Sequence, residues 1–103
     1  MYRLTVTYDH PDDPDQFLHH YRTVHAVLAS KMPGLKSYDW GLCEMPDGST
    51  PPQFLIAVLD WASKEDALTA LQSPEGQAGT ADLGNFTTPD KVSMSFTELT
   101  KQV

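Results

Sequence analysis

Four segments of the chain show the hydrophobic patterning of β-strands. Residues 2–8, 35–43 and 91–99 alternate between apolar and polar side chains, the period of two that places one side of a strand against a core. Residues 54–59, within the sequence QFLIAVLDW, are apolar without alternation. A strand that is apolar on both sides is usually a central one, so this third strand is predicted to lie inside the sheet.

The segment between the first two strands carries the start and stop signals of one helix. Asp13 suits the N-cap, Pro14 suits the first helical position, and Gln16 completes a capping-box arrangement with Asp13. The sequence MPGL then ends the helix and turns the chain. These signals predict a helix over residues 14–31.

Two shorter helices are predicted between the third and fourth strands. Ser63 caps the first, and Leu68 and Leu71 form its apolar side. Ser73 caps the second and is followed by proline at the first helical position. The second helix places three apolar side chains before the stop at Gly84, namely Ala78, Ala81 and Leu83.

The predicted order of elements is βαββαβ, the split-βαβ arrangement of ferredoxin-like folds. In this α+β topology the helices lie on one face of an antiparallel sheet and leave the other face uncovered. Because the third strand is apolar on both sides, the helices can bury only one of them. We therefore predict a homodimer that joins two copies through the uncovered sheet face, and the alternative is a hydrophobic face left in water.

Length, charge and cysteine content restrict the classes of function. A chain of 103 residues is one domain, covering residues 1–103. A formal net charge of −7 with scattered Lys and Arg residues argues against nucleic-acid binding. No apolar run approaches the roughly 18 residues that cross a membrane, and no signal peptide is recognised, so we expect a cytoplasmic protein. Cys43 is the only cysteine, which excludes an internal disulfide.

Three histidines lie on the predicted first helix. At about 100° per residue, its apolar side chains form one stripe that should face the sheet: Phe17, Tyr21, Val24, Leu28 and Met32. His25 falls inside this stripe. His20 falls at its margin and His19 points away, so both are predicted to be solvated surface residues.

The spacing of these histidines does not favour a metal site. Two helical histidines that share an ion usually lie four residues apart, whereas His19, His20 and His25 are separated by one, five and six residues. The chain also shows no flavin or nicotinamide fingerprint and no phosphate-binding glycine loop. We therefore predict neither a metal nor a cofactor.

Two separated motifs resemble the EthD family, which is named for a protein of ethyl tert-butyl ether degradation. The first motif is FLHHYRTVHAVLASKMPGLKSY and the second is ALQSPEGQAGTADLGNF. The matching positions of the first are Phe17, Tyr21, His25, Leu28, Lys31, Pro33, Gly34, Leu35 and Tyr38. Those of the second are Ser73, Pro74, Glu75, Gly76, Ala78, Asp82, Leu83, Asn85 and Phe86.

The resemblance implies a dimeric α+β barrel and a connection with oxidative metabolism. The family is commonly described as oxidoreductase-related, and neighbouring families of this architecture include cofactor-free monooxygenases and polyketide cyclases. One position departs from the Phe-Asp-Ser-like sequence expected at the end of the third strand, because Trp61 follows Asp60 here. The bulky Trp61 is expected to narrow or reshape a nearby cavity.

A functional site is expected to centre on His25. Its side chain either lines a cavity between the first helix and the sheet or is a core histidine hydrogen-bonded to a neighbour. Burial lowers the pKa of an imidazole, whereas a nearby carboxylate, Asp82 or Asp60, raises it. Tyr21 lies one turn away and either offers its hydroxyl to the same cavity or serves as a core aromatic.

Six further residues are expected to bind the ligand. Two of them share a face of the second strand and suit either the cavity or the dimer interface, namely Tyr38 and Trp40. The full set is Phe17, Leu28, Tyr38, Trp40, Asp82 and Phe86.

The sequence thus predicts an EthD-like protein that binds a small apolar or aromatic metabolite between the first helix and the sheet. With His25 and Tyr21 as catalytic residues, it would act in, or assist, an oxidative catabolic or biosynthetic step without a tightly bound nucleotide. Two alternatives stay open. One is a non-catalytic dimeric carrier, and the other is a cofactor-free cyclase or isomerase that works by proton transfer.

Overall fold

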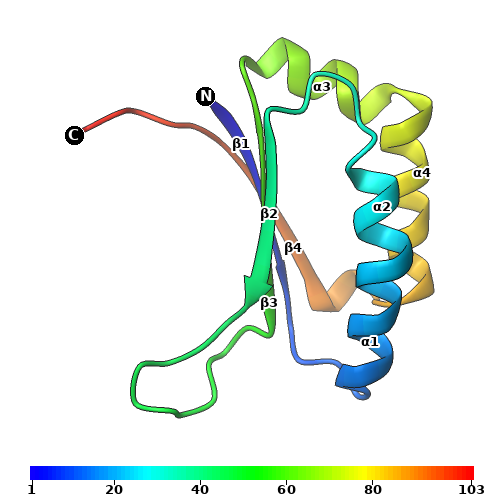
Figure 1. The fold of residues 1–103 in the computed structure, drawn as a ribbon, viewed down its shortest axis with the longest axis vertical. Helices are drawn as coiled ribbons and strands as arrows, with labels where there is room; N and C mark the ends of the chain where they lie inside the picture. The colour runs from blue at the N-terminus through cyan, green and yellow to red at the C-terminus, as the bar shows by residue number, and fades with distance from the viewer.

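The chain folds into an antiparallel four-stranded sheet with its helices packed on one face (Figure 1). The computed structural model describes the whole chain, residues 1–103. The strands are β1 (Tyr2–Tyr8), β2 (Ser37–Leu42), β3 (Leu55–Trp61) and β4 (Val92–Glu98), in the order β2-β3-β1-β4. This confirms the predicted α+β ferredoxin-like fold, with the continuously apolar β3 inside the sheet.

The predicted first helix forms, but one of its turns is of a different kind. Its three parts are α1 (Pro14–His20), the π-helical segment η1 (Tyr21–His25) and α2 (Ala26–Ala29). Asp13 caps it as predicted, because its carboxylate accepts a hydrogen bond from the backbone N–H of Gln16. In η1 the backbone N–H of Ala26 donates to the carbonyl of Tyr21, which lies five residues back instead of four.

This π turn changes which side chains of the first helix face the sheet. The buried positions are Phe17, Tyr21, His25, Ala29 and Met32. Val24 is 37% exposed and Leu28 is only half-buried, so the predicted stripe is wrong at these two positions. The wheel assumed a regular α-helix, whereas the wider turn rotates the second half of the helix relative to the first.

The two helices after β3 begin at their predicted serines. They are α3 (Lys64–Gln72) and α4 (Pro74–Asp82), followed by short 3-10 turns η2 (Leu83–Asn85) and η3 (Pro89–Lys91). Ser63 accepts a hydrogen bond from the backbone N–H of Asp66, and Ser73 accepts one from that of Gly76. Glycine is required at position 76, because a Cβ there would collide with the backbone carbonyl of Ala70.

The buried faces of α3 and α4 differ from the predicted ones. They consist of small residues and one carboxylate, namely Ala67, Ala70, Gly76, Gly79 and Asp82. Of the two leucines predicted to form the apolar side of α3, Leu68 is exposed and Leu71 is half-buried. Ala78 and Ala81 of α4 are also exposed. The small inward residues let these helices lie close to their neighbours. Asp82 is the exception, because it is charged and still faces inward.

Trp61 is the last residue of β3, and it does not line either of the two hollows described below. Its side chain is fully buried, and its indole N–H donates to the carbonyl of Pro33 at 3.2 Å. This bond holds the turn between α2 and β2, where Gly34 adopts φ 73°. Trp61 therefore lines neither hollow, and its effect on the shape of a nearby cavity stays a prediction.

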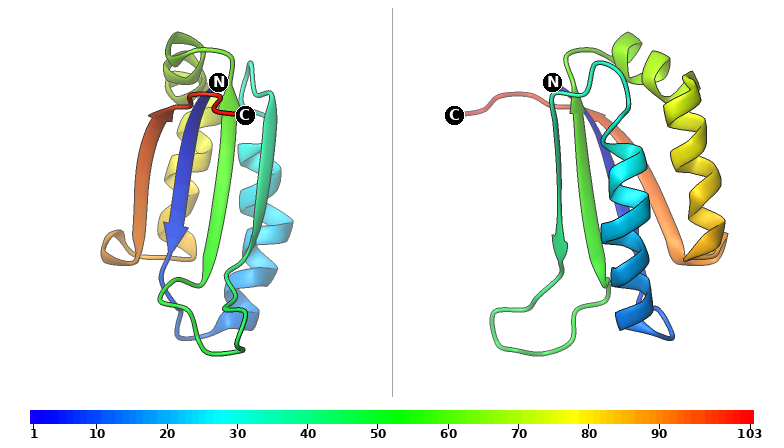
Figure 2. Two further views of the ribbon diagram at one scale, coloured as in Figure 1. Left: turned by 90° about the vertical axis from the view of Figure 1, so that its left-hand side faces the viewer. Right: turned by 45° about the vertical axis from the view of Figure 1, so that its right-hand side comes forward.

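One face of the sheet is not covered by any helix (Figure 2). The strand register places Ile56 and Val58 of β3 on this face, beside Thr7 and Thr5 of β1. The flanking strands add small and polar residues, Ser37, Asp39 and Gly41 from β2 and Ser93, Ser95 and Thr97 from β4. The apolar part of this uncovered face is thus restricted to β3.

Two irregular segments extend on the same side as the uncovered face (Figure 1). They are the long connection between β2 and β3, residues 43–54, and the C-terminal residues 99–103. None of the helices combines the length and apolar character needed to span a membrane.

Candidate functional site

A buried carboxylate on α4 holds two histidines of the first helix. The side chain of Asp82 is only 4% exposed. Its Oδ2 lies 3.1 Å from Nδ1 of His25, and its Oδ1 lies 2.9 Å from Nε2 of His20. The side-chain amide of Asn85 donates a further hydrogen bond to Oδ1 at 2.9 Å. These three partners explain why a charged residue occupies an inward position of α4.

The π turn brings both histidines to the same carboxylate. His20 ends α1 and His25 ends η1, five residues later. In a regular α-helix two residues at this spacing would point about 140° apart. The wider π turn reduces this angle, so both rings reach Asp82. Single π turns inside helices occur frequently at functional sites.

Burial and hydrogen bonding have opposite effects on the charges of this pair. Burial raises the pKa of the Asp82 carboxyl, but the hydrogen bonds from Asn85, His20 and His25 outweigh it, so the net pKa lies below its usual range. At His25 burial is the larger effect and lowers the pKa of the imidazole, while the hydrogen bond to Asp82 acts in the opposite direction. Asp82 is therefore ionised and His25 neutral at pH 7.

The charges fix the tautomer of His25. An ionised carboxylate can only accept hydrogen bonds, so Nδ1 of His25 carries the proton and donates it to Asp82. The other ring nitrogen, Nε2, then has a free lone pair and makes no hydrogen bond within the protein. Every buried side-chain nitrogen or oxygen has a partner, so Nε2 of His25 must be accessible from outside the packed core.

Asp60, the other carboxylate considered for this role, lies elsewhere. It forms a bidentate pair with the guanidinium of Arg3, at 2.8 and 2.9 Å. Of the two carboxylates that the sequence offered as partners of His25, the structure thus selects Asp82.

A pair of tyrosine hydroxyls lies beside the imidazole. The hydroxyls of Tyr21 and Tyr38 are 2.7 Å apart, and the ring of Tyr21 lies 5.4 Å from that of His25 between centroids. Burial raises the pKa of both phenols, so both are neutral. One O–H donates to the other oxygen, which leaves a second O–H free to donate to a ligand.

These groups line a cavity between the helices and the sheet, which we call the apolar cavity. Its volume is about 60 Å³, and 12 of its 16 lining residues are hydrophobic. Tyr8, Tyr21, His25 and Tyr38 lie on its wall. Met94 of β4 also lines it and is 48% exposed, which marks an open side at the β4 edge. The space suits one end of a small ligand, since pockets that enclose drug-sized molecules measure roughly 300–1,000 Å³.

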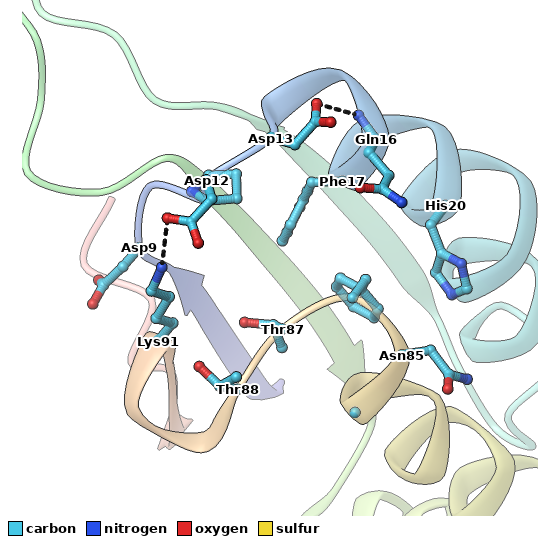
Figure 3. A pocket seen from close by; sticks show the side chains of 13 residues that line it. Asp9, Asp12, Asp13, Gln16, Phe17, His20, Asn85, Thr87, Thr88 and Lys91 are labelled. Atoms are coloured by element: carbon cyan, nitrogen blue, oxygen red, sulfur yellow. Dashed lines mark hydrogen bonds and ion pairs between the residues drawn. The ribbon is translucent and has the colours of Figure 1, made fainter.

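A second hollow, which we call the polar groove, lies between the segment after β1, the first helix and the segment after α4 (Figure 3). It measures about 390 Å³, and only 2 of its 13 lining residues are hydrophobic. Two of its lining residues, His20 and Asn85, are hydrogen-bonded to Asp82. Its other lining residues are Asp9, Pro11, Asp12, Asp13, Gln16, Phe17, Gly84, Phe86, Thr87, Thr88 and Lys91.

The predicted site residues divide into three groups. The apolar cavity brings together Tyr21, His25 and Tyr38. The polar groove contains Phe17 and Phe86. Neither hollow is lined by Leu28, Trp40 or Asp82. Trp40 instead packs against the ring of Tyr21 at 4.9 Å, and Asp82 lies behind His25, where it orients the imidazole.

His20 is not the solvated surface residue that was predicted. Its side chain is 26% exposed, bonds both oxygens of Asp82 and stacks on the ring of Phe86 at 5.3 Å. The helical wheel missed it because the π turn lies between His20 and His25. Tyr8 was also missed as a site residue, since the alternation of β1 marks it only as a core position. His19 is exposed, as predicted.

His20, His25 and Asp82 do not form a metal site. The ring nitrogens that face Asp82 are occupied by hydrogen bonds to its oxygens. No group of three His, Cys, Asp or Glu side chains in the chain is placed to hold a metal ion. The cluster is a hydrogen-bonded acid–base assembly.

Comparison with known proteins identifies the family. The EthD domain matches residues 9–90. An uncharacterized 11.0 kDa protein from the thcB-thcC intergenic region of Rhodococcus erythropolis is 41% identical over 98 residues, which cover 95% of this chain and 94% of that protein. The chain belongs to the EthD family. Both motifs singled out in the sequence lie within the matched region, and with them the Asp82–His25 pair.

Solved structures agree with the fold of this EthD-family chain. An EthD family protein from Bacillus halodurans superposes with a TM-score of 0.89 at 26% identity, covering 97% of this chain and 99% of that one.

More distant structures share the fold alone. A dimeric ferredoxin-like protein of unknown function from Thermobifida fusca has a TM-score of 0.71 at 17% identity, over 95% of this chain and 90% of that one. A mutant of SnoaB, described as a cofactor-independent oxygenase from Streptomyces nogalater, has a TM-score of 0.66 at 14% identity, over 99% of this chain and 94% of that one. The fold thus occurs in dimers and in an oxygenase.

Proposed function

We propose that this EthD-family protein binds a small apolar or aromatic metabolite in the apolar cavity and transfers a proton on it through His25. One observation carries the proposal. A neutral imidazole is held by a buried, ionised carboxylate at Nδ1, while its Nε2 has no protein partner and the ring lines an apolar cavity. Pocket groups with shifted pKa values and a defined charge partner are typical of functional sites.

The neighbouring groups support a proton-transfer step. Nε2 of His25 takes a proton from an acidic C–H or O–H of the ligand, and Asp82 stabilises the imidazolium that forms. The free O–H of the Tyr21–Tyr38 pair donates to the ligand oxygen on which negative charge develops. General acid–base catalysis of this kind typically contributes about 10²–10⁴-fold in rate.

This step suits a place in, or beside, an oxidative catabolic or biosynthetic reaction. Deprotonation makes an organic substrate a better electron donor to dioxygen, and a cofactor-independent oxygenase is known on this fold. The chain shows no nucleotide-binding motif, so we propose that the step needs no tightly bound nucleotide. The same residues would also serve a cyclase or an isomerase.

A non-catalytic carrier is the second candidate function. The observation that favours it is the direct hydrogen bond between the Tyr21 and Tyr38 hydroxyls, which lets both polar groups sit in the cavity wall without a reaction partner. A carrier would bind the ligand but leave its protons unchanged.

Acetophenone tests both candidates, because it joins an aromatic ring to a carbonyl with acidic α-protons. NMR shifts of the Met94 methyl group and the His25 ring report binding, and α-proton exchange in deuterated water reports proton transfer. We expect saturable binding, and exchange that falls by at least about 10²-fold in His25→Gln. His19→Gln is the matched control, since His19 is exposed and lies on the same helix.

Each outcome decides between the candidates. Binding with exchange that depends on His25 supports the enzyme, and binding without exchange establishes the carrier. If acetophenone does not shift the cavity resonances, or if His25→Gln and the wild type exchange equally, the proposed function is wrong.

We further propose that the protein forms a homodimer through the uncovered sheet face. Ile56, which is 41% exposed, and Val58 supply an apolar centre, and residues 43–54 and 99–103 extend on the same side (Figure 1). The related Thermobifida fusca structure is described as dimeric.

Light scattering tests the dimer. The double variant Ile56→Lys and Val58→Lys should have half the molar mass of the wild type, because each protomer would place two lysine charges in the proposed apolar interface. Leu68→Lys is the control, since Leu68 is 42% exposed on the helical side. A monomeric wild type, or a double variant that remains dimeric, would contradict the proposal.

A further inference from the structure

His20 and His25 approach Asp82 from two different compartments. His20 lines the polar groove and His25 lines the apolar cavity. Both rings bond the same oxygen, since Oδ2 lies 3.0 Å from Nε2 of His20 and 3.1 Å from Nδ1 of His25. The two imidazoles therefore share one negative charge.

The two histidines that share Asp82 differ in their exposure to water. The side chain of His20 is 26% exposed, that of His25 is 9% exposed, and that of Asp82 between them is 4% exposed. Protons from water thus reach His20 through the polar groove more readily than they reach His25. His20 is also fixed in orientation, because its ring stacks on Phe86 with an interplanar angle of 26°.

No other ionised group stands between Asp82 and His25. The remaining titratable side chains in the apolar cavity are Tyr8 on β1, Tyr21 on η1 and Tyr38 on β2. Burial raises the pKa of each of these phenols, so they carry no charge at pH 7. The charge that His25 senses is set by Asp82 and by the protonation of His20.

Around His20 the charged groups are more numerous but more exposed. The polar groove contains Asp9, Asp12 and Asp13 from the segment between β1 and α1, and Lys91 from η3. Lys91 lies 3.5 Å from Asp12, which is fully exposed. Water in the groove screens these charges, whereas the contact of His20 with Asp82 is direct.

We propose that His20 is a positioning residue for His25, which acts through Asp82 and makes the readiness of His25 to accept a proton depend on conditions in the polar groove. When His20 is neutral, the whole charge of Asp82 is available to stabilise a protonated His25. When His20 takes up a proton from the groove, it neutralises Asp82 and opposes a second positive charge on His25.

This inference rests on the proposed function only for its consequence, because the coupling between the two rings exists whether or not His25 is catalytic. In the proposed enzyme, acidification of the groove would switch off the base in the apolar cavity.

NMR titration of the histidine ring protons in the intact protein tests the coupling. In the wild type, His25 should titrate in two overlapping steps, the signature of interacting groups. In His20→Gln the side-chain amide can still donate to Asp82 but cannot carry a proton. We expect His25 to titrate there in one step, with its midpoint raised by at least about 0.5 pH units.

Two further variants distinguish charge coupling between His20 and His25 from a purely structural effect of removing a neighbour of Asp82. His19→Gln should leave the His25 titration unchanged, since His19 is exposed and has no contact with Asp82. Asn85→Ala removes an uncharged donor to Asp82 and should retain the two-step titration. A one-step His25 titration in the wild type, or an unchanged midpoint in His20→Gln, would overturn the inference.

The outcome is distinct from that of the proposed function. The titration requires no ligand, so coupling without acetophenone exchange would leave this inference intact and remove the enzyme. Exchange that depends on His25, without coupling, would do the reverse.

Discussion

The apolar cavity and the polar groove each receive one of the two histidines that Asp82 holds. The cavity is small and largely hydrophobic, with His25 deeply buried on its wall. The groove is several times larger, polar and rich in carboxylates. Two residues of the same type, bonded to the same partner, therefore occupy opposite dielectric environments.

This difference is the reason why we propose His25, and not His20, as the group that transfers a proton on an apolar ligand. Removal from water keeps His25 neutral and leaves Nε2 as a base, whereas the side chain of His20 is 26% exposed and borders the polar groove. The same burial strengthens the effect of Asp82, since charges interact more strongly where water is excluded. Three changes test this difference between the two histidines: removal of the shared carboxylate, a substitution in the wall of the apolar cavity, and a change of pH.

The largest effect is expected from Asp82→Ala, which removes the group common to both hollows. His20, His25 and Asn85 each lose an acceptor, and a buried donor left without a partner typically costs about 1–3 kcal/mol, so the loss of all three contacts should cost about 3 kcal/mol or more. Urea denaturation should show a decrease of this size in the free energy of unfolding. A loss of less than about 1 kcal/mol would mean that the hydrogen bonds of Asp82 to His20 and His25 contribute little to stability.

A smaller effect is expected from Tyr21→Phe on the cavity side. The substitution leaves the Tyr38 hydroxyl without its partner, which typically costs about 1–3 kcal/mol for a buried group. Acetophenone binding should weaken as well, because the free O–H is lost. Tyr2→Phe is the control, since Tyr2 is half-buried and its hydroxyl makes no hydrogen bond. Equal stability of the two variants would exclude a role for the tyrosine pair.

The smallest effect is expected from pH, and its sign follows from the lowered pKa of His25. Below its reference pKa of 6.5, the unfolded chain takes up a proton at His25 that the folded protein does not bind. The free energy of unfolding should therefore decrease as the pH falls from 6.5 toward the pKa of the folded state. This decrease should be absent in His25→Gln and retained in His19→Gln.

Asp82 acts in a separate and more acidic range. The pKa of its carboxyl is lowered in the folded state, so its contribution to stability is present above the reference value of 3.8 and is lost as the pH falls below it. A wild-type profile that is flat between pH 6.5 and 4 would contradict the burial of a neutral His25.

The elements of the fold could be predicted because their signals are local. Alternation gave β1 with the bounds observed, and Asp13, Ser63 and Ser73 cap the helices that they were predicted to cap. The continuous apolar run of β3 placed that strand inside the sheet. Each of these features depends on residues within a few positions of one another.

The site could be predicted only in part, because its contacts are not local. His25 was found by its place in the apolar stripe, and Tyr21 and Tyr38 by patterning and family resemblance. The contacts on which the proposed role of His20 rests depend on a π turn that a regular helical wheel does not contain. The bond from His25 to Asp82 joins positions that the chain brings together only through packing of α4 on the first helix.

The most direct test of the central claim is a crystal structure of the protein with acetophenone bound. The Asp82–His25 pair predicts that the carbonyl oxygen lies within hydrogen-bonding distance of the Tyr21–Tyr38 pair in the apolar cavity. The α-carbon should face Nε2 of His25, and the Asp82 contact at Nδ1 should persist. Acetophenone in the polar groove, or an Nε2 turned away from the ligand, would contradict the claim that His25 is the working group.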